Sequence, residues 1–165
     1  MAVTSDIVAL WRKPRSTFRA KLAEGVREDR AIAVLLAACG LSFVAQWPAL
    51  ARAAHLHPDV PLEARMAGAL LGTVFLLPLV AYAVAGVSHL LARAFGGRGS
   101  FYGARLALFW ALLAAAPGAL FYGLIAGLLG NGAGALLAGV LVFAGFLWLW
   151  LSMLVEAEGG RATWT

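Results

Sequence analysis

Four long apolar runs dominate the chain, and none of them contains an Asp, Glu, Lys or Arg. They cover residues 31–50, 67–92, 106–129 and 133–155. An α-helix rises about 1.5 Å per residue, so a run of about 20 residues crosses a hydrocarbon core of about 30 Å. The alternating pattern of a transmembrane β-barrel is absent. The pattern therefore predicts an all-α, polytopic membrane protein with four transmembrane helices.

Residues 3–22 show a different, amphipathic pattern. Their large apolar side chains recur every three or four positions and fall on one stripe of a helix, with the basic side chains off that stripe. We expect this segment to lie on the cytoplasmic membrane surface, with basic side chains near anionic lipid. The alternative is that the stripe packs on the spans of the protein itself. Pro14 has no amide proton, which predicts a break into two short helices near residue 13. The residues expected at the membrane surface are Trp11, Arg12, Lys13, Arg15, Phe18 and Arg19.

Composition agrees with a membrane protein. The 165 residues are 62% hydrophobic and 13% charged, whereas a soluble domain is about 45–50% apolar and about 25% charged. A soluble chain of this length has no interior large enough for so much apolar surface. Cys39 is the single cysteine, which excludes an intrachain disulfide and a cysteine metal site. We expect Cys39 to be a small packing residue.

The basic residues are distributed unevenly between the two sides of the predicted bundle. Eleven lie in residues 1–30, in the segment 93–105 and at Arg161, whereas only Arg52 and Arg65 lie on the other side. Basic loops stay in the cytoplasm, so both termini are expected there. Acidic residues reduce the charge of the N-terminal segment, so a nucleic-acid partner is not expected. The predicted domains are a cytoplasmic interfacial segment, 1–30, a transmembrane domain, 31–156, and a cytoplasmic tail, 157–165.

Two glycine-containing loops connect the predicted spans. Residues 130–132 read Gly-Asn-Gly, a tight turn that makes the third and fourth spans antiparallel neighbours. The inner loop between the second and third spans contains Gly96, Gly97, Arg98 and Gly99. It lacks the Gly-Lys-Ser/Thr of a P-loop and the third glycine of a dinucleotide-binding loop. We expect a tight turn with at least one positive φ here.

Small residues and prolines inside the spans predict packing and kinks. Two pairs of glycines four residues apart let helix backbones approach closely, within the bundle or between copies. Prolines in the second and third spans predict kinks, while the alternative is the broken helices that form ion sites in transporters. The residues concerned are Gly68, Gly72, Gly123, Gly127, Pro78 and Pro117.

Few polar residues suggest chemistry. His89 lies near the inner end of the second span, where it either serves a function or bonds a neighbouring helix or a lipid head group. His55 and His57 lie in the outer loop near two carboxylates, a weak metal-binding pattern that favours a solvated loop. Since no catalytic triad, carboxylate pair or metal triad lies within the spans, we expect neither an enzyme nor a cofactor.

The order of these features resembles the bacterial branch of the Yip family, membrane proteins named for their interaction with Ypt/Rab GTPases. The resemblance rests on Trp11, Pro14 and Phe18 before the first span, on the segment 95–101, which reads Phe-Gly-Gly-Arg-Gly-Ser-Phe, and on Pro117 at the centre of the third span. It implies an all-α membrane domain with a cytoplasmic N-terminal region, here in a bacterial inner membrane. Eukaryotic members are implicated in vesicle trafficking and membrane shaping. The Asp-Leu-Tyr-Gly-Pro type motif before the first span is missing, so a GTPase partner is not carried over.

Two functional hypotheses follow. The first is a non-enzymatic scaffold, accessory or assembly protein that binds lipid through residues 1–30 and a larger membrane complex, or a second copy, through its spans. The second is a small transporter or channel that works as an oligomer. A polar-lined path through the bundle would favour the second, and a dry core the first.

Overall fold

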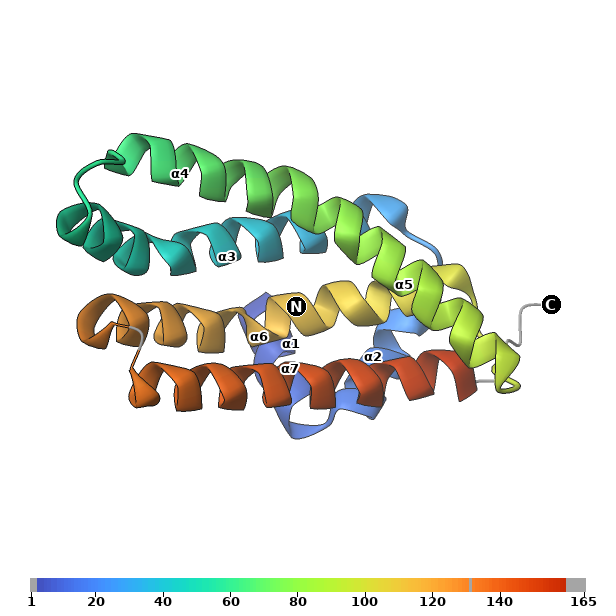
Figure 1. Ribbon diagram of the computed structural model, residues 1–165. Helices are drawn as coiled ribbons and strands as arrows, with labels where there is room; N and C mark the ends of the chain where they lie inside the picture. The colour runs from blue at the N-terminus through green and yellow to red at the C-terminus, as the bar shows by residue number, and fades with distance from the viewer. Residues whose placement is uncertain (1–2, 131, 160–165) are drawn as a thin grey trace.

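The computed structural model of the protein describes residues 3–130 and 132–159, and within these ranges it consists of helices joined by short loops, with no strand (Figure 1). Four helical segments are long and apolar enough to cross a membrane. Each of the four predicted runs lies inside one of these segments, so the all-α prediction with four spans is confirmed. The elements are α1 (Val3–Arg12), α2 (Pro14–Ala23), α3 (Glu28–Leu56), α4 (Leu62–Leu70), the π-helix η1 (Leu71–Leu76), α5 (Leu77–Ala94), α6 (Phe101–Leu129) and α7 (Ala133–Gly159).

The N-terminal segment breaks where proline dictates. Helix α1 ends at Arg12 and α2 begins at Pro14, with Lys13 between them in a non-helical conformation. Proline is favoured in the first turn of a helix, where its missing amide proton leaves no bond unmade. The predicted break near residue 13 is therefore confirmed.

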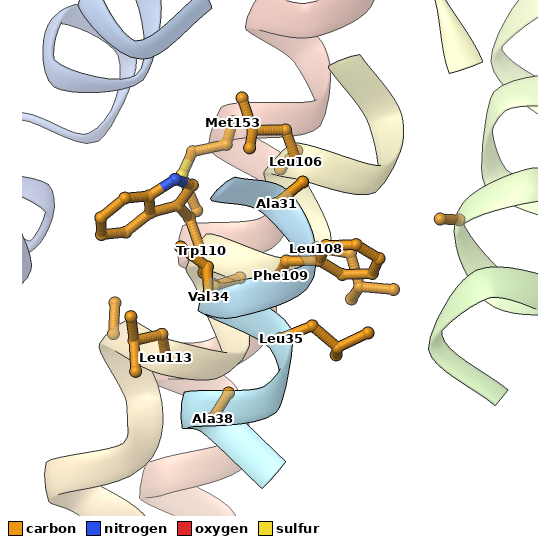
Figure 2. Close-up of a cluster of buried hydrophobic side chains, with 14 of the residues drawn as sticks. Ala31, Val34, Leu35, Ala38, Leu106, Leu108, Phe109, Trp110, Leu113 and Met153 are labelled. Carbon is orange, nitrogen blue, oxygen red and sulfur yellow. The ribbon is translucent and has the colours of Figure 1, made fainter. Parts of the chain in front are cut away.

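Helix α6 is the centre of the bundle. It packs most extensively against α3 and α7, and the half of α6 that follows Phe101 is buried almost completely. Alanine is the most frequent of its buried residues, and this small side chain lets neighbouring helices approach closely. Figure 2 shows how Phe109 and Trp110 of α6 fill the space beside Val34 and Leu35 of α3.

Glycines of α6 let α3 come still closer in the other half of the helix. A Cβ at Gly123 would collide with the backbone of Ala45, and one at Gly127 would collide with Pro48. This second glycine pair therefore packs within the bundle, as predicted. A Cβ at Gly68 or Gly72 would meet nothing within 4 Å, so the first pair forms no close helix contact in this chain.

The second span contains a distortion that sequence analysis did not find. Residues 71–76 form a π-helix immediately before Pro78. The proline ring cannot fit against the carbonyl four residues earlier, and a wider turn relieves that clash. The predicted kink at Pro78 is thus a π-helical stretch, whereas Pro117 lies inside the uninterrupted helix α6.

Candidate functional site at the basic end

Most of the charged side chains gather at one end of the bundle, which we call the basic end. It consists of α2, the start of α3, the loop between α5 and α6, and the end of α7, and α1 extends from it along the bundle toward the middle of α6 and α7 (Figure 1). The opposite end, called the far end, holds the α3–α4 and α6–α7 connections. Three features of the basic end stand out: a docked N-terminal segment, an ionic network and a buried His–Glu pair.

The N-terminal segment docks on the spans. Leu10 and Phe18 are 0% exposed and belong to the protein core. Trp11 stacks on Trp148 of α7, and its indole Nε1 donates a hydrogen bond to the carbonyl oxygen of Ala114 at 2.8 Å. Ala114 lies three residues before Pro117 in α6, and this proline has no amide proton to donate within the helix. Leu10 and Phe18 therefore pack on the protein itself, as the alternative expected, whereas Trp11 keeps 42% of its surface exposed and its contact with lipid stays a prediction.

This docking corrects the membrane-surface prediction for Phe18, whose ring is enclosed by protein and does not face lipid. The prediction failed because an amphipathic stripe is the same for a lipid surface and for a protein groove. Arg12, Lys13 and Arg15 remain exposed, and their contact with a head group stays a prediction. Arg19 pairs with Glu156 at 2.7 Å, and this hydrogen bond and charge raise the pKa of its guanidinium.

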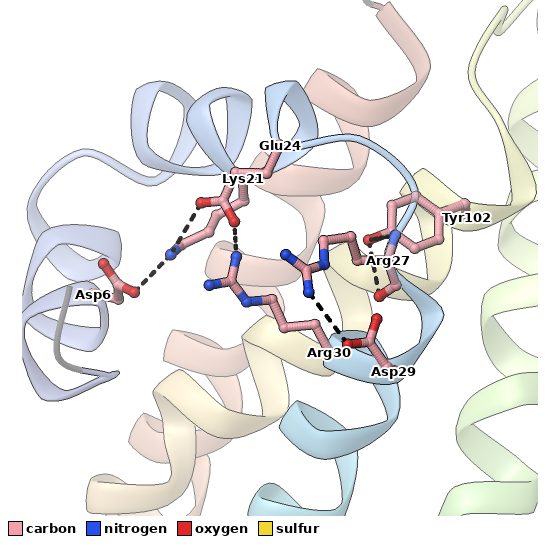
Figure 3. Close-up of polar contacts among 7 residues, drawn as sticks. All are labelled: Asp6, Lys21, Glu24, Arg27, Asp29, Arg30 and Tyr102. Carbon is pink, nitrogen blue, oxygen red and sulfur yellow. Dashed lines mark hydrogen bonds and ion pairs between the residues drawn. The ribbon is translucent and has the colours of Figure 1, made fainter.

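A chain of ion pairs connects α1, α2 and α3 (Figure 3). Lys21 Nζ lies 2.6 Å from Asp6 Oδ2 and 3.8 Å from Glu24 Oε1, and Glu24 also pairs with Arg30. Lys21 is further held 4.9 Å from the ring centroid of Trp110. Asp6 is buried, and a buried carboxylate needs such a partner to stay charged.

A cavity of about 260 Å³ opens beside this network. Its wall combines charged residues of α1, α2 and α3 with apolar residues of α1, α3 and α6. The lining residues are Val3, Asp6, Lys21, Glu24, Arg30, Ala33, Val34, Ala37, Trp110 and Leu113.

His89 forms the second polar centre of the basic end. Its Nδ1 shares a hydrogen bond of 2.6 Å with Glu158 Oε1, and the two residues are 2% and 6% exposed. The second oxygen, Oε2, accepts from the amide of Gly99 at 3.1 Å. The ring of Phe101 covers the imidazole at a centroid distance of 4.2 Å. His89 thus bonds a neighbouring helix, which is one of the alternatives that the sequence analysis gave for this residue.

The inner loop is shaped around Glu158. Gly96 has a φ of +88°, which confirms the expected positive φ. A Cβ at Gly97 or Gly99 would collide with the Glu158 carboxylate and nearby backbone. The amide of Arg98 donates to the carbonyl oxygen of Glu158 at 3.0 Å. The loop glycines therefore allow close approach to α7, and the side chain of Arg98 is left exposed.

Sequence analysis did not predict the roles of three of these partners. Glu158 follows the predicted end of the fourth span, where a carboxylate usually faces water. Asp6 and Lys21 lie on different helices, so their pairing depends on the fold of the whole segment. The position of Asp6, three residues after Val3 and four before Leu10 beside the apolar stripe of α1, is the one signal that sequence analysis could have used.

The remaining candidate residues lie at the far end. His55 is in the last turn of α3, and His57 follows that helix. The carbonyl oxygens of His57 and Val60 accept hydrogen bonds from Arg65 at 3.0 and 3.1 Å. Within residues 3–130 and 132–159, no three His, Cys, Asp or Glu side chains come close enough to hold a metal ion.

Comparison with known proteins identifies the family of the chain. The model of the Yip1 domain matches residues 8–164, nearly the whole sequence. No curated protein and no solved structure gives a significant match. The family match agrees with four apolar helices and marks the chain as a membrane protein.

Proposed function

The chain belongs to the Yip1 domain family, and from this premise we propose that it is a non-enzymatic scaffold, accessory or assembly protein. It sits in the inner membrane of a bacterium with both termini in the cytoplasm. There its basic end contacts anionic lipid and a larger membrane protein complex.

The docked N-terminal segment is the observation that carries this proposal. The spans hold α1 and α2 through Leu10, Phe18 and the Trp11–Ala114 hydrogen bond. The same segment keeps Arg12 and Lys13 exposed. A rigid surface with ordered charges suits a binding partner better than a mobile tail does, because less conformational entropy is lost on binding.

An exposed phenylalanine extends this surface. Phe95, at the start of the inner loop, is 90% exposed and stands between Arg93 and Arg98. Aromatic and arginine side chains are enriched at protein interfaces. Phe95 is therefore the best position from which to capture a partner.

Close packing in the middle of the bundle favours the scaffold over the transporter. The α3–α6 seam has no room for a methyl group at Gly123 or Gly127. The buried polar side chains of the described residues are Asp6, His89 and Glu158, all at the basic end. A conducting path along this seam would need the two helices to separate.

Photo-crosslinking tests the proposal. We expect p-benzoylphenylalanine at position 95 to form an adduct with a discrete membrane protein in intact cells. The matched control is position 75, because Phe75 is 66% exposed but lies in the middle of the second span. Lack of a protein adduct at 95, or the same adducts at both positions, would contradict a partner surface at the basic end.

Two further measurements address orientation and transport. Cysteine at position 59 should react with an impermeant thiol reagent from outside, and cysteine at position 98 should be protected, in a Cys39→Ala background. Proteoliposomes should show no ion or solute flux above that of empty vesicles. Labelling at 98 would reverse the orientation, and a saturable flux would favour the transporter.

A further inference from the structure

We infer that the cavity beside the ionic network binds the phosphoethanolamine head group of one membrane lipid. This inference rests on the proposed function, because it needs the basic end to lie at a membrane interface. Four arguments support it: the charges of the cavity wall, their linkage, the arrangement of polar and apolar residues, and the volume.

The charges of the cavity wall balance. Two carboxylates, from Asp6 and Glu24, face two cations, from Lys21 and Arg30. A site for a purely anionic ligand would carry an excess of cations. A balanced set instead suits a zwitterion, whose phosphate pairs with the cations and whose ammonium pairs with the carboxylates.

The longest ion pair of the network, between Lys21 and Glu24, is the place at which such a zwitterion fits. Lys21 is close to Asp6, at 2.6 Å, but 3.8 Å from Glu24. Glu24 and Arg30 are also the more exposed members, with side chains 40% and 52% exposed. A phosphate that takes the place of the Glu24 carboxylate between Lys21 and Arg30, with its ammonium beside the released Glu24, would leave every charge paired.

The cavity wall becomes apolar away from the basic end. Along α3 it passes from Arg30 to Ala33 and then to Ala37, a rise of about 10 Å. Along α6 it passes from Trp110 to Leu113, in the same direction. The charged residues thus lie at one end of a groove whose apolar part is open at the exposed Ala33 and Ala37, and this arrangement matches a lipid, whose head group continues into glycerol and acyl chains.

The volume limits what enters. About 260 Å³ is below the range of about 300–1,000 Å³ usual for drug-sized ligands. It holds a head group and the first part of the glycerol, with the chains outside against the apolar helices. A primary ammonium donates three hydrogen bonds, as a lysine does, whereas the trimethylated ammonium of phosphocholine donates none. We therefore expect discrimination between these two head groups.

Native mass spectrometry of the full-length protein tests this assignment. The delipidated protein is mixed with phosphatidylethanolamine, phosphatidylcholine or phosphatidylglycerol of identical acyl chains, or with soluble O-phosphoethanolamine. We expect one tightly retained phosphatidylethanolamine per chain, with at least tenfold lower affinity for each of the other three. Equal retention of all lipids, or a preference for phosphatidylglycerol, would overturn the zwitterion site, and tight binding of soluble O-phosphoethanolamine would overturn a lipid source.

Variants locate the binding to this cavity. Glu24→Gln and Arg30→Gln change half-exposed side chains, so both proteins should fold, and each should bind phosphatidylethanolamine at least fivefold more weakly. Arg19→Gln is the matched control, because it also removes an ion pair of α2 but lies outside the cavity wall. Denaturant titration without added lipid checks that the variant proteins are folded. Undiminished binding in intact Glu24→Gln and Arg30→Gln proteins would place the lipid elsewhere.

The outcome is separable from that of the proposed function. If position 95 forms no protein adduct but phosphatidylethanolamine is still retained selectively, the partner surface is contradicted and the head-group site is supported. If position 95 forms the adduct but no lipid is bound selectively, the partner surface is supported and the head-group site is contradicted.

Discussion

The two ends of the bundle use their arginines differently. At the far end, Arg52 donates to the carbonyl oxygen of Leu128 at 3.0 Å and Arg65 to that of His57 at 3.0 Å. Both carbonyls lie at helix C-termini, which lack intrahelical donors and carry partial negative charge. The far-end arginines therefore complete the helices themselves.

At the basic end, charged side chains instead pair with side chains of other helices. Asp6 and Lys21 join α1 to α2, and His89 joins α5 to Glu158 of α7. Arg105 of α6 pairs with Glu28 of α3 and lies over the ring of Tyr82. The difference teaches that the charged residues at one end are more than a topology signal, because they connect six helices.

Removal of the Glu158 carboxylate is expected to have the largest effect. Glu158→Ala leaves His89 and the amide of Gly99 buried without their acceptor, and loss of one partner of a buried pair costs about 3–5 kcal/mol. Denaturant titration in mixed micelles measures this loss of unfolding free energy. Glu156→Ala is the control, since its partner Arg19 is 73% exposed. Equal stability of the two variants would mean that the basic end is held together by apolar packing alone.

A clash in the α3–α6 seam should have the next largest effect. Gly123→Val drives a side chain into the backbone of Ala45, and overpacking costs about 1–3 kcal/mol or more. Gly68→Val is the matched control, because its Cβ meets nothing within 4 Å and valine is a better helix former than glycine. Denaturant titration should show a loss of unfolding free energy for Gly123→Val only. A stable Gly123→Val protein would show that the seam opens easily, which would revive the transporter hypothesis.

Loss of the Trp11 hydrogen bond should open the N-terminal segment locally. Trp11→Phe keeps a ring against Trp148 but removes the donor to Ala114, a loss of about 0.5–1.5 kcal/mol. Trypsin cleavage at Arg12 and Arg15 should accelerate roughly 2- to 12-fold, the population change for that energy. Trp47→Phe, on an exposed ring of α3, should leave the cleavage rate unchanged. An unchanged rate in Trp11→Phe would argue that lipid, not α6, holds the segment.

The sequence predicted those features that depend on neighbouring residues. Charge-free runs located the spans, Pro14 located the break between α1 and α2, and the loop glycines predicted the positive φ at Gly96. The pair Gly123 and Gly127 predicted close helix packing because glycine permits it wherever a partner helix comes near.

Features that depend on distant segments could not be predicted. Gly68 and Gly72 have the same spacing as the other pair, yet no helix of this chain lies against them. The stripe that contains Phe18 has the same sequence pattern whether lipid or a helix of the protein such as α7 covers it. The pairing of His89 with Glu158, 69 residues later, exists only because the inner loop folds over the end of α7.

The smallest expected effect is at the far end, and it sharpens the comparison between the two ends. Arg52→Gln removes a charge from the C-terminus of α6, where a cation contributes about 0.3–1 kcal/mol. We expect faster amide hydrogen exchange in the turns around Leu128 and Gly130, and the difference should shrink at high salt because the charge is partly exposed and screened. The exchange rate in Arg52→Lys should lie between those of the unchanged protein and Arg52→Gln, since lysine keeps the charge but loses the planar donor geometry. Crosslinking from position 95 should be the same in all three proteins, because Arg52 of α3 acts on the C-terminus of α6 at the far end. If Arg52→Gln instead abolished that crosslink without changing exchange near Leu128, the far end would take part in partner binding and the division of roles between the ends would be wrong.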